Sequence, residues 1–233
     1  MNYKILITGT NRGLGLAMLK IYLAQGHIVF TINRRVNDDL QNLKAKYTDH
    51  LNMFTGDVTD EPSIIKAISC ISNKTSAIDL LINNAAILFP ADNVLIEQVD
   101  FSVYEQTFQV NSIGPLKVIK HALPLVRQGQ GKRIVNISSE AGSIADAWRK
   151  SEYAYCMSKS ALNMASRILQ NYVEKDGIKV LAIQPGWFSS DMGTSRAPIT
   201  PDQAAQKVVA VLQQPFELTG PMFYDNDGNV LNW

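Results

Sequence analysis

The chain begins with a short apolar run that ends directly at a glycine-rich turn. Tyr3 to Thr8 reads Tyr-Lys-Ile-Leu-Ile-Thr, and Gly9, Gly13 and Gly15 follow it. An apolar run of this length, stopped by glycine, is typical of a buried parallel strand. The next stretch, Leu16 to Gln25, has the amphipathic pattern of a helix. A strand, a glycine turn and a helix in this order predict the start of a βαβ unit.

Strand-like and helix-like stretches alternate along the rest of the chain. The further predicted strands are residues 27–33, 51–55, 78–82, 133–138, 179–184 and 221–224. The further predicted helices are residues 36–47, 59–71, 101–127, 152–175 and 200–213, the third with a kink at Gly114-Pro115. This alternation predicts an α/β fold with a doubly wound parallel sheet and helices on both faces. No internal repeat or Ser/Gly-rich linker interrupts it, so we expect a single domain over residues 1–233.

The overall composition and charge of the chain indicate which binding partners and which cellular compartment to expect. The formal net charge of +1 gives no electrostatic reason to expect nucleic acid or an anionic membrane surface. No apolar run reaches the ~18–20 residues that span a bilayer, and the start of the chain lacks the pattern of a signal peptide. Cys70 and Cys156 lie in helix-like surroundings, which favours free thiols in a reducing compartment. His27, His50 and His121 are scattered without ligand spacing. We therefore expect a cytoplasmic protein without a metal site or a membrane or nucleic-acid partner.

The glycine-rich turn has the features of a phosphate-binding site. Glycines let the backbone approach a pyrophosphate, and a helix N-terminus supplies free N–H groups and a positive dipole. The spacing Gly9-x-x-x-Gly13-x-Gly15 differs from the common G-x-G-x-x-G fingerprint. A tight turn without a ligand is the alternative interpretation. Three glycines at the first strand–helix turn of a doubly wound sheet favour a dinucleotide site.

The residues after the second predicted strand indicate which dinucleotide binds. An acidic residue there holds a ribose 2′-hydroxyl, whereas a basic residue accommodates a 2′-phosphate. The chain has Asn33-Arg34-Arg35 at this point and Arg12 inside the glycine turn. Because arginine pairs with a phosphate through two hydrogen bonds, NADP(H) is favoured over NAD(H). In the alternative interpretation Arg34 and Arg35 are solvated loop charges, and we expect one of them to be so.

Tyr155 and Lys159 are the strongest catalytic candidates. Residues four apart share one face of a helix, and these two fall in the helix predicted after the fifth strand. A free tyrosine has a pKa of roughly 10, and a cation within ~4–6 Å lowers it. We expect Lys159, together with an oxidised nicotinamide, to lower the pKa of Tyr155 so that it can move a proton near neutral pH. A Tyr-x-x-x-Lys pattern alone is weak evidence, and its position after Asn111 and Ser139 gives it weight.

Several motifs occur together and in order along the chain: Thr8-Gly9-x-x-x-Gly13-x-Gly15, Asp57-Val58, Asn83-Asn84-Ala85, Asn111, Ser138-Ser139, Tyr155-x-x-x-Lys159 and Pro185-Gly186. On these motifs the chain resembles the short-chain dehydrogenase/reductases over essentially its whole length. Residues 185–193, Ala197-Pro198, Thr200-Pro201 and residues 227–233 resemble most closely the subgroup of C-factor proteins and sniffer-type carbonyl reductases. The resemblance implies a Rossmann-type sheet with strand order 3-2-1-4-5-6-7.

The resemblance also implies roles for individual residues. Tyr155 would be the proton donor, and Ser139 would hydrogen-bond the substrate oxygen. Lys159 would bind the nicotinamide ribose, and Asn111 would hold a water that links Lys159 to solvent. The implied cofactor-binding residues are Gly9, Asn11, Arg12, Gly13, Leu14, Gly15, Asn33, Arg34, Asp57, Val58, Asn83, Ala85, Ile87, Tyr155, Lys159, Pro185, Gly186, Phe188 and Ser190.

The chain departs from the family pattern at three points. Ala86 stands where glycine is usual, and Ser190 stands where threonine is more common. The interval between Ser139 and Tyr155 is a few residues longer than usual. Ser138 therefore remains an alternative to Ser139 as the residue that contacts the substrate.

These features predict an NADP(H)-dependent oxidoreductase that reduces a carbonyl to an alcohol by hydride transfer, with Tyr155 as proton donor. The candidate wall residues of the substrate site are mostly apolar and include no cation, which favours a hydrophobic aldehyde, ketone or quinone. They are Leu88, Phe89, Ala141, Trp148, Trp187, Phe188 and Met192. The alternative is a catalytically silent dinucleotide-binding regulatory or cell-signalling protein of the same fold. The resemblance keeps that alternative open and also implies a homodimer.

Overall fold

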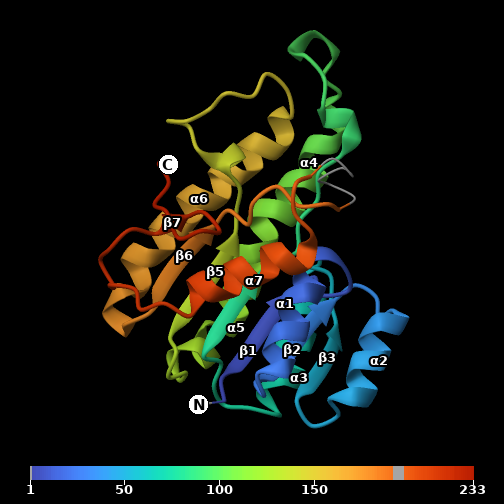
Figure 1. Ribbon diagram of the computed structural model, residues 1–233, viewed down its shortest axis with the longest axis vertical. Helices are drawn as coiled ribbons and strands as arrows, with labels where there is room; N and C mark the ends of the chain where they lie inside the picture. The colour runs from blue at the N-terminus through green and yellow to red at the C-terminus, as the bar shows by residue number, and fades with distance from the viewer. Residues whose placement is uncertain (1, 191–196) are drawn as a thin grey trace.

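Seven parallel strands form one sheet in the computed structural model, which describes residues 2–190 and 197–233. Their order is β3-β2-β1-β4-β5-β6-β7 (Figure 1), which confirms the predicted fold class and strand order. The strands are β1 (Lys4–Thr8), β2 (Ile28–Asn33), β3 (Leu51–Thr55), β4 (Leu80–Asn83), β5 (Arg133–Ile137), β6 (Lys179–Ile183) and β7 (Phe223–Tyr224). Because β1 pairs with both β2 and β4, the strand order reverses between β1 and β4.

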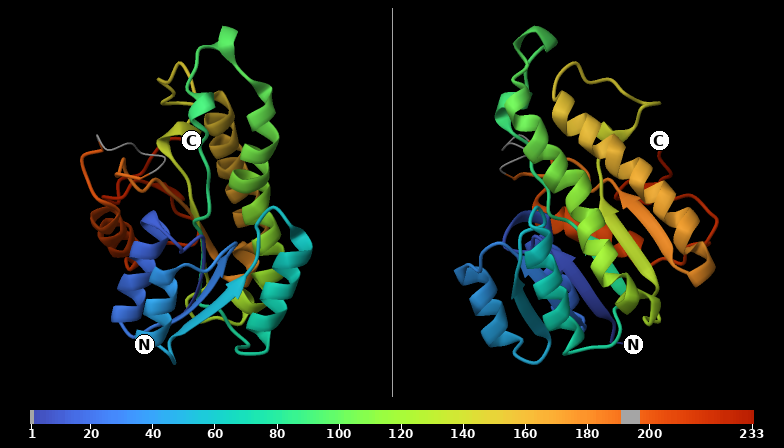
Figure 2. Two further views of the ribbon diagram at one scale, coloured as in Figure 1. Left: turned by 90° about the vertical axis from the view of Figure 1, so that its right-hand side faces the viewer. Right: turned by 180° about the vertical axis from the view of Figure 1, so that it is seen from behind.

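Helices cover both faces of the sheet, as the two further views in Figure 2 show. Side chains of α1, α2 and α7 join one apolar cluster, and side chains of α3, α5 and α6 join the other. The helices are α1 (Gly13–Ala24), α2 (Asp38–Lys46), α3 (Glu61–Ser72), α4 (Tyr104–Phe108), α5 (Gly114–Arg127), α6 (Tyr153–Val173) and α7 (Pro201–Leu212).

Successive side chains of each central strand enter opposite clusters. On β1, Ile5 and Ile7 pack with the cluster of α1 and α7, and Leu6 packs with the cluster of α3 and α5. All three side chains are fully buried. A strand covered on both faces needs apolar residues at every position, which explains why β1 reads as a continuous apolar run.

The segment predicted as one kinked helix over residues 101–127 is divided into several pieces. A 3-10 turn (Phe101–Val103), α4, a π-helical segment (Gln109–Ile113) and α5 follow one another. The irregularity therefore precedes Gly114-Pro115 instead of lying at it. Pro115 has no N–H to donate to the carbonyl four residues earlier, so the turn before it can widen. Gly114 is needed here because a Cβ at this position would lie 2.9 Å from Cβ of Val58.

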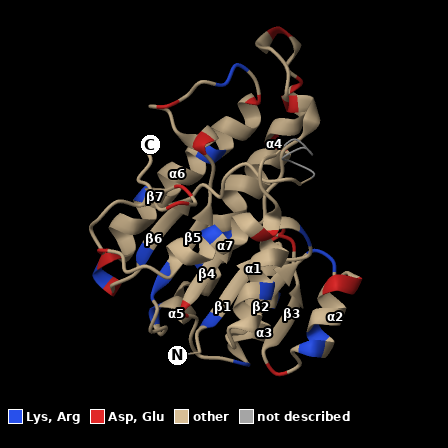
Figure 3. Cartoon of the chain, in the orientation of Figure 1, with Lys and Arg blue, Asp and Glu red and all other residues tan. Residues whose placement is uncertain are grey.

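Most charged residues lie on the outside of the fold (Figure 3), whereas Asp79, Asp92, Lys159 and Lys179 are buried. In α2, Asp38 and Asp39 occupy the first turn, and Lys44 and Lys46 occupy the last. This order opposes the helix dipole and stabilises the helix. Within the described ranges, no helix is both long and apolar enough to cross a membrane.

Candidate active site

A cleft with a volume of ≈ 860 Å³ opens at the carboxyl ends of the central strands. It lies where the strand order reverses between β1 and β4, the usual ligand position in doubly wound sheets. The predicted site residues in its wall are Gly9, Asn11, Arg12, Gly13, Leu14, Gly15, Asn33, Arg34, Asp57, Val58, Ala85, Ile87, Ser139, Tyr155, Lys159, Pro185, Gly186, Phe188 and Ser190.

The glycine turn leaves room for a ligand at the start of α1. Gly9 has φ of 71° and Gly13 has φ of 55°, in the left-handed region that glycine tolerates best. A Cβ on Gly9 would lie 2.9 Å from Cα of Ala85, whereas a Cβ on Gly13 would meet no described atom within 4 Å. The first turn of α1 has no acidic residue, and no described side chain caps it. The free N–H groups and the open space fit the pyrophosphate of a dinucleotide.

Two asparagines hold this turn in place. Asn33 accepts a hydrogen bond from the Thr10 N–H at 2.6 Å and donates to the Thr10 hydroxyl at 2.9 Å. Asn84 donates to the carbonyls of Thr8 at 3.1 Å and Gly9 at 2.8 Å. The amide of Asn33 is thus bound to the protein itself, so this residue shapes the cleft through the turn. Asn84, which was not among the predicted site residues, is a second support.

Basic side chains line the end of the cleft beyond β2. Arg34 and Arg12 both belong to its wall, whereas Arg35 is not among the described residues that line it. Asp57 accepts hydrogen bonds from the N–H and the hydroxyl of Thr59 at 2.9 and 2.8 Å, which fixes the loop opposite. Arg34, from the loop after β2, and Arg12, from the glycine turn, are thus the arginines of this part of the cleft wall.

Tyr155, Lys159 and Ser139 meet in the middle of the cleft. Lys159 Nζ lies 5.7 Å from the centre of the Tyr155 ring, one turn away on α6. The loop after β5 carries Ser139 into the wall of the same cleft, where its hydroxyl acts to lower the pKa of Tyr155. Lys159 is 2% exposed and donates from Nζ to the carbonyl of Ile137 at 2.8 Å. The predicted serine, tyrosine and lysine therefore form one group.

Burial controls the pKa values in this group. It raises the pKa of Tyr155 to about 12, and the negative charge of Glu140 contributes to this rise. The Ser139 hydroxyl and the positive charge of Arg149 act in the opposite direction and lower the pKa, but their effect is smaller. Burial also lowers the pKa of Lys159 to about 8. The direction for Tyr155 is opposite to the expected one because removing the hydroxyl from water disfavours the phenolate. Tyr155 is accordingly protonated at neutral pH, the state that a proton donor requires.

Asn111 lies directly behind the cleft in the π-helical segment and is 1% exposed. Its Oδ1 accepts from the Ile87 N–H at 2.8 Å, and its Nδ2 donates to the Ile87 carbonyl at 2.8 Å. Nδ2 also donates to the Ser158 hydroxyl at 3.1 Å. The side chain of Asn111 thus joins the loop after β4 to the helix that carries Tyr155.

The two serines after β5 have different surroundings. Ser138 donates its hydroxyl proton to Asn163 on α6 at 2.6 Å, whereas Ser139 faces the tyrosine. The geometry therefore favours Ser139 as the substrate contact. Asn83, which was expected to line the cofactor groove, is not among the described lining residues. It is the last residue of β4 and is buried, and it donates to Asn136 on β5 at 2.9 Å. Asn83 therefore ties two strands together and does not face the cleft.

The predicted wall of the substrate site is only partly apolar. Leu88, Trp148, Trp187 and Phe188 line the cleft, whereas Phe89 and Ala141 are not among the described lining residues. Met192 lies outside the described residues. The prediction that the wall contains no cation is wrong, because Arg149 lines the cleft. No group of three or more possible metal ligands occurs within the part of the chain that the structure describes.

A charged network beside Ser139 was missed from the sequence. The Arg149 guanidinium pairs with Glu140 through Nη2 and with Glu152 through Nη1. Ser139 donates its hydroxyl proton to the other carboxylate oxygen of Glu140 at 2.8 Å. The only sequence signal was that Glu140 directly follows the serine pair.

Asp92 is a second residue that sequence reasoning missed. It is 3% exposed, and its carboxylate accepts from the backbone N–H groups of Ala154 at 3.1 Å and Tyr155 at 2.8 Å. An acidic side chain at a helix N-terminus satisfies free N–H groups and complements the dipole. Asp92 thereby holds the first turn of α6, which carries Tyr155.

The fold, the glycine turn and the Ser-Tyr-Lys group together define a class of dinucleotide-dependent oxidoreductase. The family model for short chain dehydrogenases matches residues 3–199, and the chain belongs to this family.

Individual relatives agree with the resemblance seen in the motifs. The C-signal protein of Myxococcus xanthus is 33% identical over 161 residues, which cover 68% of this chain and 95% of the relative. Among solved structures, the carbonyl reductase Sniffer of D. melanogaster has a TM-score of 0.93 at 29% identity, with 100% of both chains covered. The NADPH-bound carbonyl reductase from chicken fatty liver has a TM-score of 0.90 at 30% identity, covering 100% of this chain and 99% of the other. The predicted resemblance to the short-chain dehydrogenase/reductases is confirmed.

Proposed function

We propose that the protein is an NADP(H)-dependent carbonyl reductase with Tyr155 as the proton donor. The observation that carries this proposal is that Ser139, Tyr155 and Lys159 meet in a cleft whose far end is the glycine turn of α1. A group that donates a proton and a site for a dinucleotide are thus parts of one cavity. Carbonyl reduction needs both.

In the proposed reaction each of these residues has a separate role. A reduced nicotinamide held in the cleft would supply the hydride for the carbonyl carbon. The electron pair of the carbonyl π bond moves to the oxygen, which takes the proton of the Tyr155 hydroxyl. Ser139 hydrogen-bonds that oxygen as its negative charge develops. Lys159 is a cation below its pKa of about 8, so it stabilises the tyrosinate until solvent returns the proton. Asn111 would support proton return by holding a water near Lys159.

The preference for NADP(H) over NAD(H) rests on the charge of the cofactor end. Arg12 and Arg34 both line the cleft beyond β2. A 2′-phosphate there would meet guanidinium groups, which bind phosphate through paired hydrogen bonds. The NADPH bound to the similar carbonyl reductase from chicken also supports a preference for NADP(H). Residues Asn11, Leu14, Val58, Ile87, Phe188 and Ser190 would complete the cofactor site.

The substrate that we propose is a carbonyl compound with an apolar body. Trp148 and Trp187 line the cleft with exposed fractions of 71% and 54%. Large aromatic surfaces left open at the mouth of a cleft favour an apolar or aromatic ligand. An aldehyde, ketone or quinone of this kind fits the cavity.

A homodimer is part of the proposal. Met164, Ile168 and Tyr172 repeat every four residues on α6 and are all exposed, and Leu116 on α5 is exposed as well. An apolar stripe of this kind often marks a protein interface. Sedimentation velocity should give twice the monomer mass, and a monomer at micromolar concentration would remove this part of the proposal.

The function is tested by mixing the protein with NADPH and a panel of aromatic aldehydes and diketones. Loss of the reduced-nicotinamide absorbance is the expected result. The alternative is a dinucleotide-binding signalling protein without turnover, which the similarity to C-signal favours. Unchanged absorbance across the panel, with NADPH binding shown by fluorescence, would select that alternative.

A further inference from the structure

The hydroxyl proton of Ser139 is already engaged within the protein. It donates its single proton to Glu140 Oε2 at 2.8 Å. Its oxygen accepts from the Ala141 N–H at 3.2 Å. A hydroxyl has a single proton, and that of Ser139 is taken by Glu140.

The carboxylate that receives this proton is held in place. Glu140 Oε1 is paired with Arg149, which is itself paired with Glu152, so Oε2 remains directed at Ser139. Burial works to raise the pKa of Glu140, but the hydrogen bonds from Arg149 and Ser139 outweigh it and hold that pKa below its usual value. Glu140 is therefore ionised at neutral pH and can only accept hydrogen bonds.

Polarising a substrate carbonyl requires the Ser139 proton to leave Glu140. Ser139 has no second proton, so turning its O–H toward the substrate oxygen leaves Glu140 Oε2 without its donor. Hydrogen bonds to charged groups are among the stronger ones, and an unpaired acceptor in a cleft is unfavourable. A substrate that brings its own donor to Glu140 avoids this loss.

We propose that Glu140 selects carbonyl substrates that carry a hydroxyl on the carbon next to the carbonyl. This proposal rests on the proposed reductase function and names its substrate class more closely. In an α-hydroxy ketone the two oxygens lie about one hydrogen-bond length apart, similar to the 2.8 Å between Ser139 Oγ and Glu140 Oε2. The substrate carbonyl takes the Ser139 proton, and the substrate hydroxyl donates to Glu140. Glu140 lines the cleft and its side chain is 36% exposed, so a ligand can reach it.

The apolar wall and the carboxylate then recognise different parts of one molecule. Trp148 and Leu88 would contact the aromatic or aliphatic part of the substrate, and Glu140 would accept a hydrogen bond from the substrate hydroxyl. An aryl hydroxymethyl ketone has both parts.

The test compares three ketones that differ only beside the carbonyl. The first is 2-hydroxyacetophenone, the second is 2-methoxyacetophenone, which keeps the oxygen but has no donor, and the third is propiophenone, which has the size of the first. For the wild-type protein with NADPH, kcat/KM for the hydroxy ketone should exceed that of each analogue by about tenfold or more.

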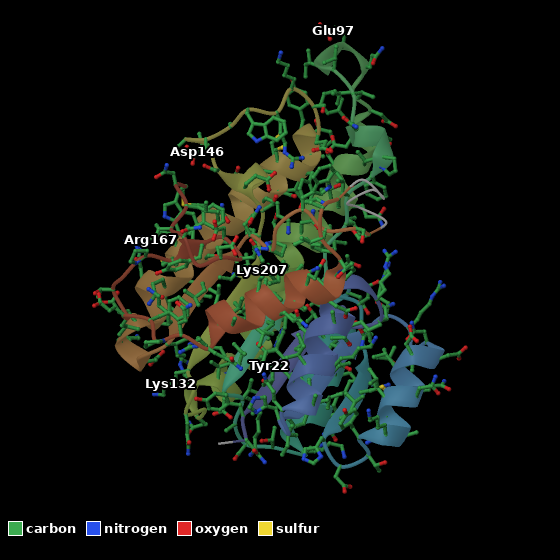
Figure 4. The ribbon with its side chains drawn as sticks, viewed as in Figure 1. Tyr22, Glu97, Lys132, Asp146, Arg167 and Lys207 are labelled. Atoms are coloured by element: carbon green, nitrogen blue, oxygen red, sulfur yellow. The ribbon has the colours of Figure 1, made fainter. Side chains whose placement is uncertain are left out.

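Glu140→Gln should abolish this preference. Arg149 needs an acceptor, so the glutamine oxygen faces Arg149 and its NH₂ group faces Ser139 and the substrate. A donor now meets the substrate hydroxyl, and the ratio of hydroxy to methoxy ketone should fall to about one or below. Glu152→Gln is the matched control, because it removes the other carboxylate from Arg149 without touching Ser139. It should keep the preference, as should Glu97→Gln at the far tip of the loop after β4 (Figure 4).

A binding measurement separates this proposal from the function itself. The wild-type protein loaded with NADPH should bind 1-phenyl-1,2-ethanediol about tenfold more tightly than 2-methoxy-1-phenylethanol by calorimetry, and Glu140→Gln should remove the difference. If the wild-type protein reduces none of the ketones, the proposed reductase function is wrong. The calorimetric comparison of the two alcohols still tests whether Glu140 recognises the hydroxyl. A hydroxy preference that survives Glu140→Gln, or that is lost equally in Glu152→Gln, overturns the proposal.

Discussion

Replacing Lys159 with methionine should make the protein more stable at neutral pH while removing its activity. Lys159 is buried, and within the described part of the chain its Nζ donates to the carbonyl of Ile137. Burial lowers its pKa from 10.5 to about 8. Each pKa unit is worth about 1.4 kcal/mol, so at pH 7 the folded state carries a penalty of about 3 kcal/mol for keeping this ammonium charged. The lost hydrogen bond to Ile137 offsets about 1 kcal/mol, which leaves Lys159→Met about 2 kcal/mol more stable.

The sign of the pH dependence follows from the same shift. Between pH 8 and 10.5 the unfolded state binds more protons at Lys159 than the folded state, so the free energy of unfolding of the wild-type protein rises with pH there. The advantage of Lys159→Met should be complete below pH 8 and should fall to near zero by about pH 9.5. Measurements should stop below pH 10, because the raised pKa of Tyr155 destabilises the fold above that value.

The assay is urea denaturation of both proteins at pH 7 and pH 9.5, followed by tryptophan fluorescence. Lys66→Met, which changes an exposed lysine on α3, is the control and should alter the free energy of unfolding little at either pH. A Lys159→Met protein that is less stable than wild type at pH 7, or an advantage that does not shrink with pH, refutes the reasoning. The expected result would mean that the buried ammonium is kept for function at the expense of stability.

Three further predictions test separate parts of the site. Tyr155→Phe should lower kcat by about a hundredfold or more while NADPH fluorescence titrations stay nearly unchanged, and retained turnover would exclude the proton-donor role. Arg34→Ala should raise the KM for NADPH about tenfold more than the KM for NADH, whereas Arg35→Ala should raise neither, and equal losses for both cofactors would remove Arg34 from the 2′-phosphate site. Asp92→Ala should cost about 1 kcal/mol in urea denaturation and lower kcat more than it changes the KM for NADPH, because it frees the first turn of α6; an unchanged stability would contradict the capping role.

The fold was predictable because its signals are local. Most strands of the sheet are short apolar runs that end at a glycine, an asparagine or a proline-glycine pair, and helix-like stretches lie between them. The parallel order then follows from the connection rules and the motif resemblance. The pieces of the active site that follow strand ends, Gly9 and Ser139, were predictable for the same reason, since the carboxyl ends of parallel strands meet at one edge.

The sequence-based predictions that differ from the structure concern the direction of side chains and interactions between charges far apart in the chain. Asn83 and Asn84 are neighbours in one turn, yet Asn83 bonds across to β5 and Asn84 bonds to the glycine turn. Which of two adjacent residues faces a cleft depends on the exact end of the strand, which a motif does not specify. Arg149 lies on an irregular loop, so no periodicity indicates that its guanidinium reaches Glu140. The raised pKa of Tyr155 depends on burial by several elements, which one helix face cannot show.

The π-helical segment holds two walls of the cleft in fixed positions, the loop that contains Ile87 and the helix that carries Tyr155. In a regular α-helix, consecutive side chains diverge by about 100°, so two neighbours do not face the same partner. Here Asn111 bonds to the Ser158 hydroxyl at 3.1 Å, and Ser112 bonds to the Ser158 carbonyl at 2.8 Å. The Ser158 hydroxyl in turn donates to the carbonyl of Tyr155 at 2.7 Å. Because Asn111 also holds both backbone groups of Ile87, the wider turn before Pro115 links the cofactor wall and the Tyr155 helix through one side chain. An irregularity in the backbone thus fixes the distance between the two halves of the proposed reaction, a common role of π turns at functional sites.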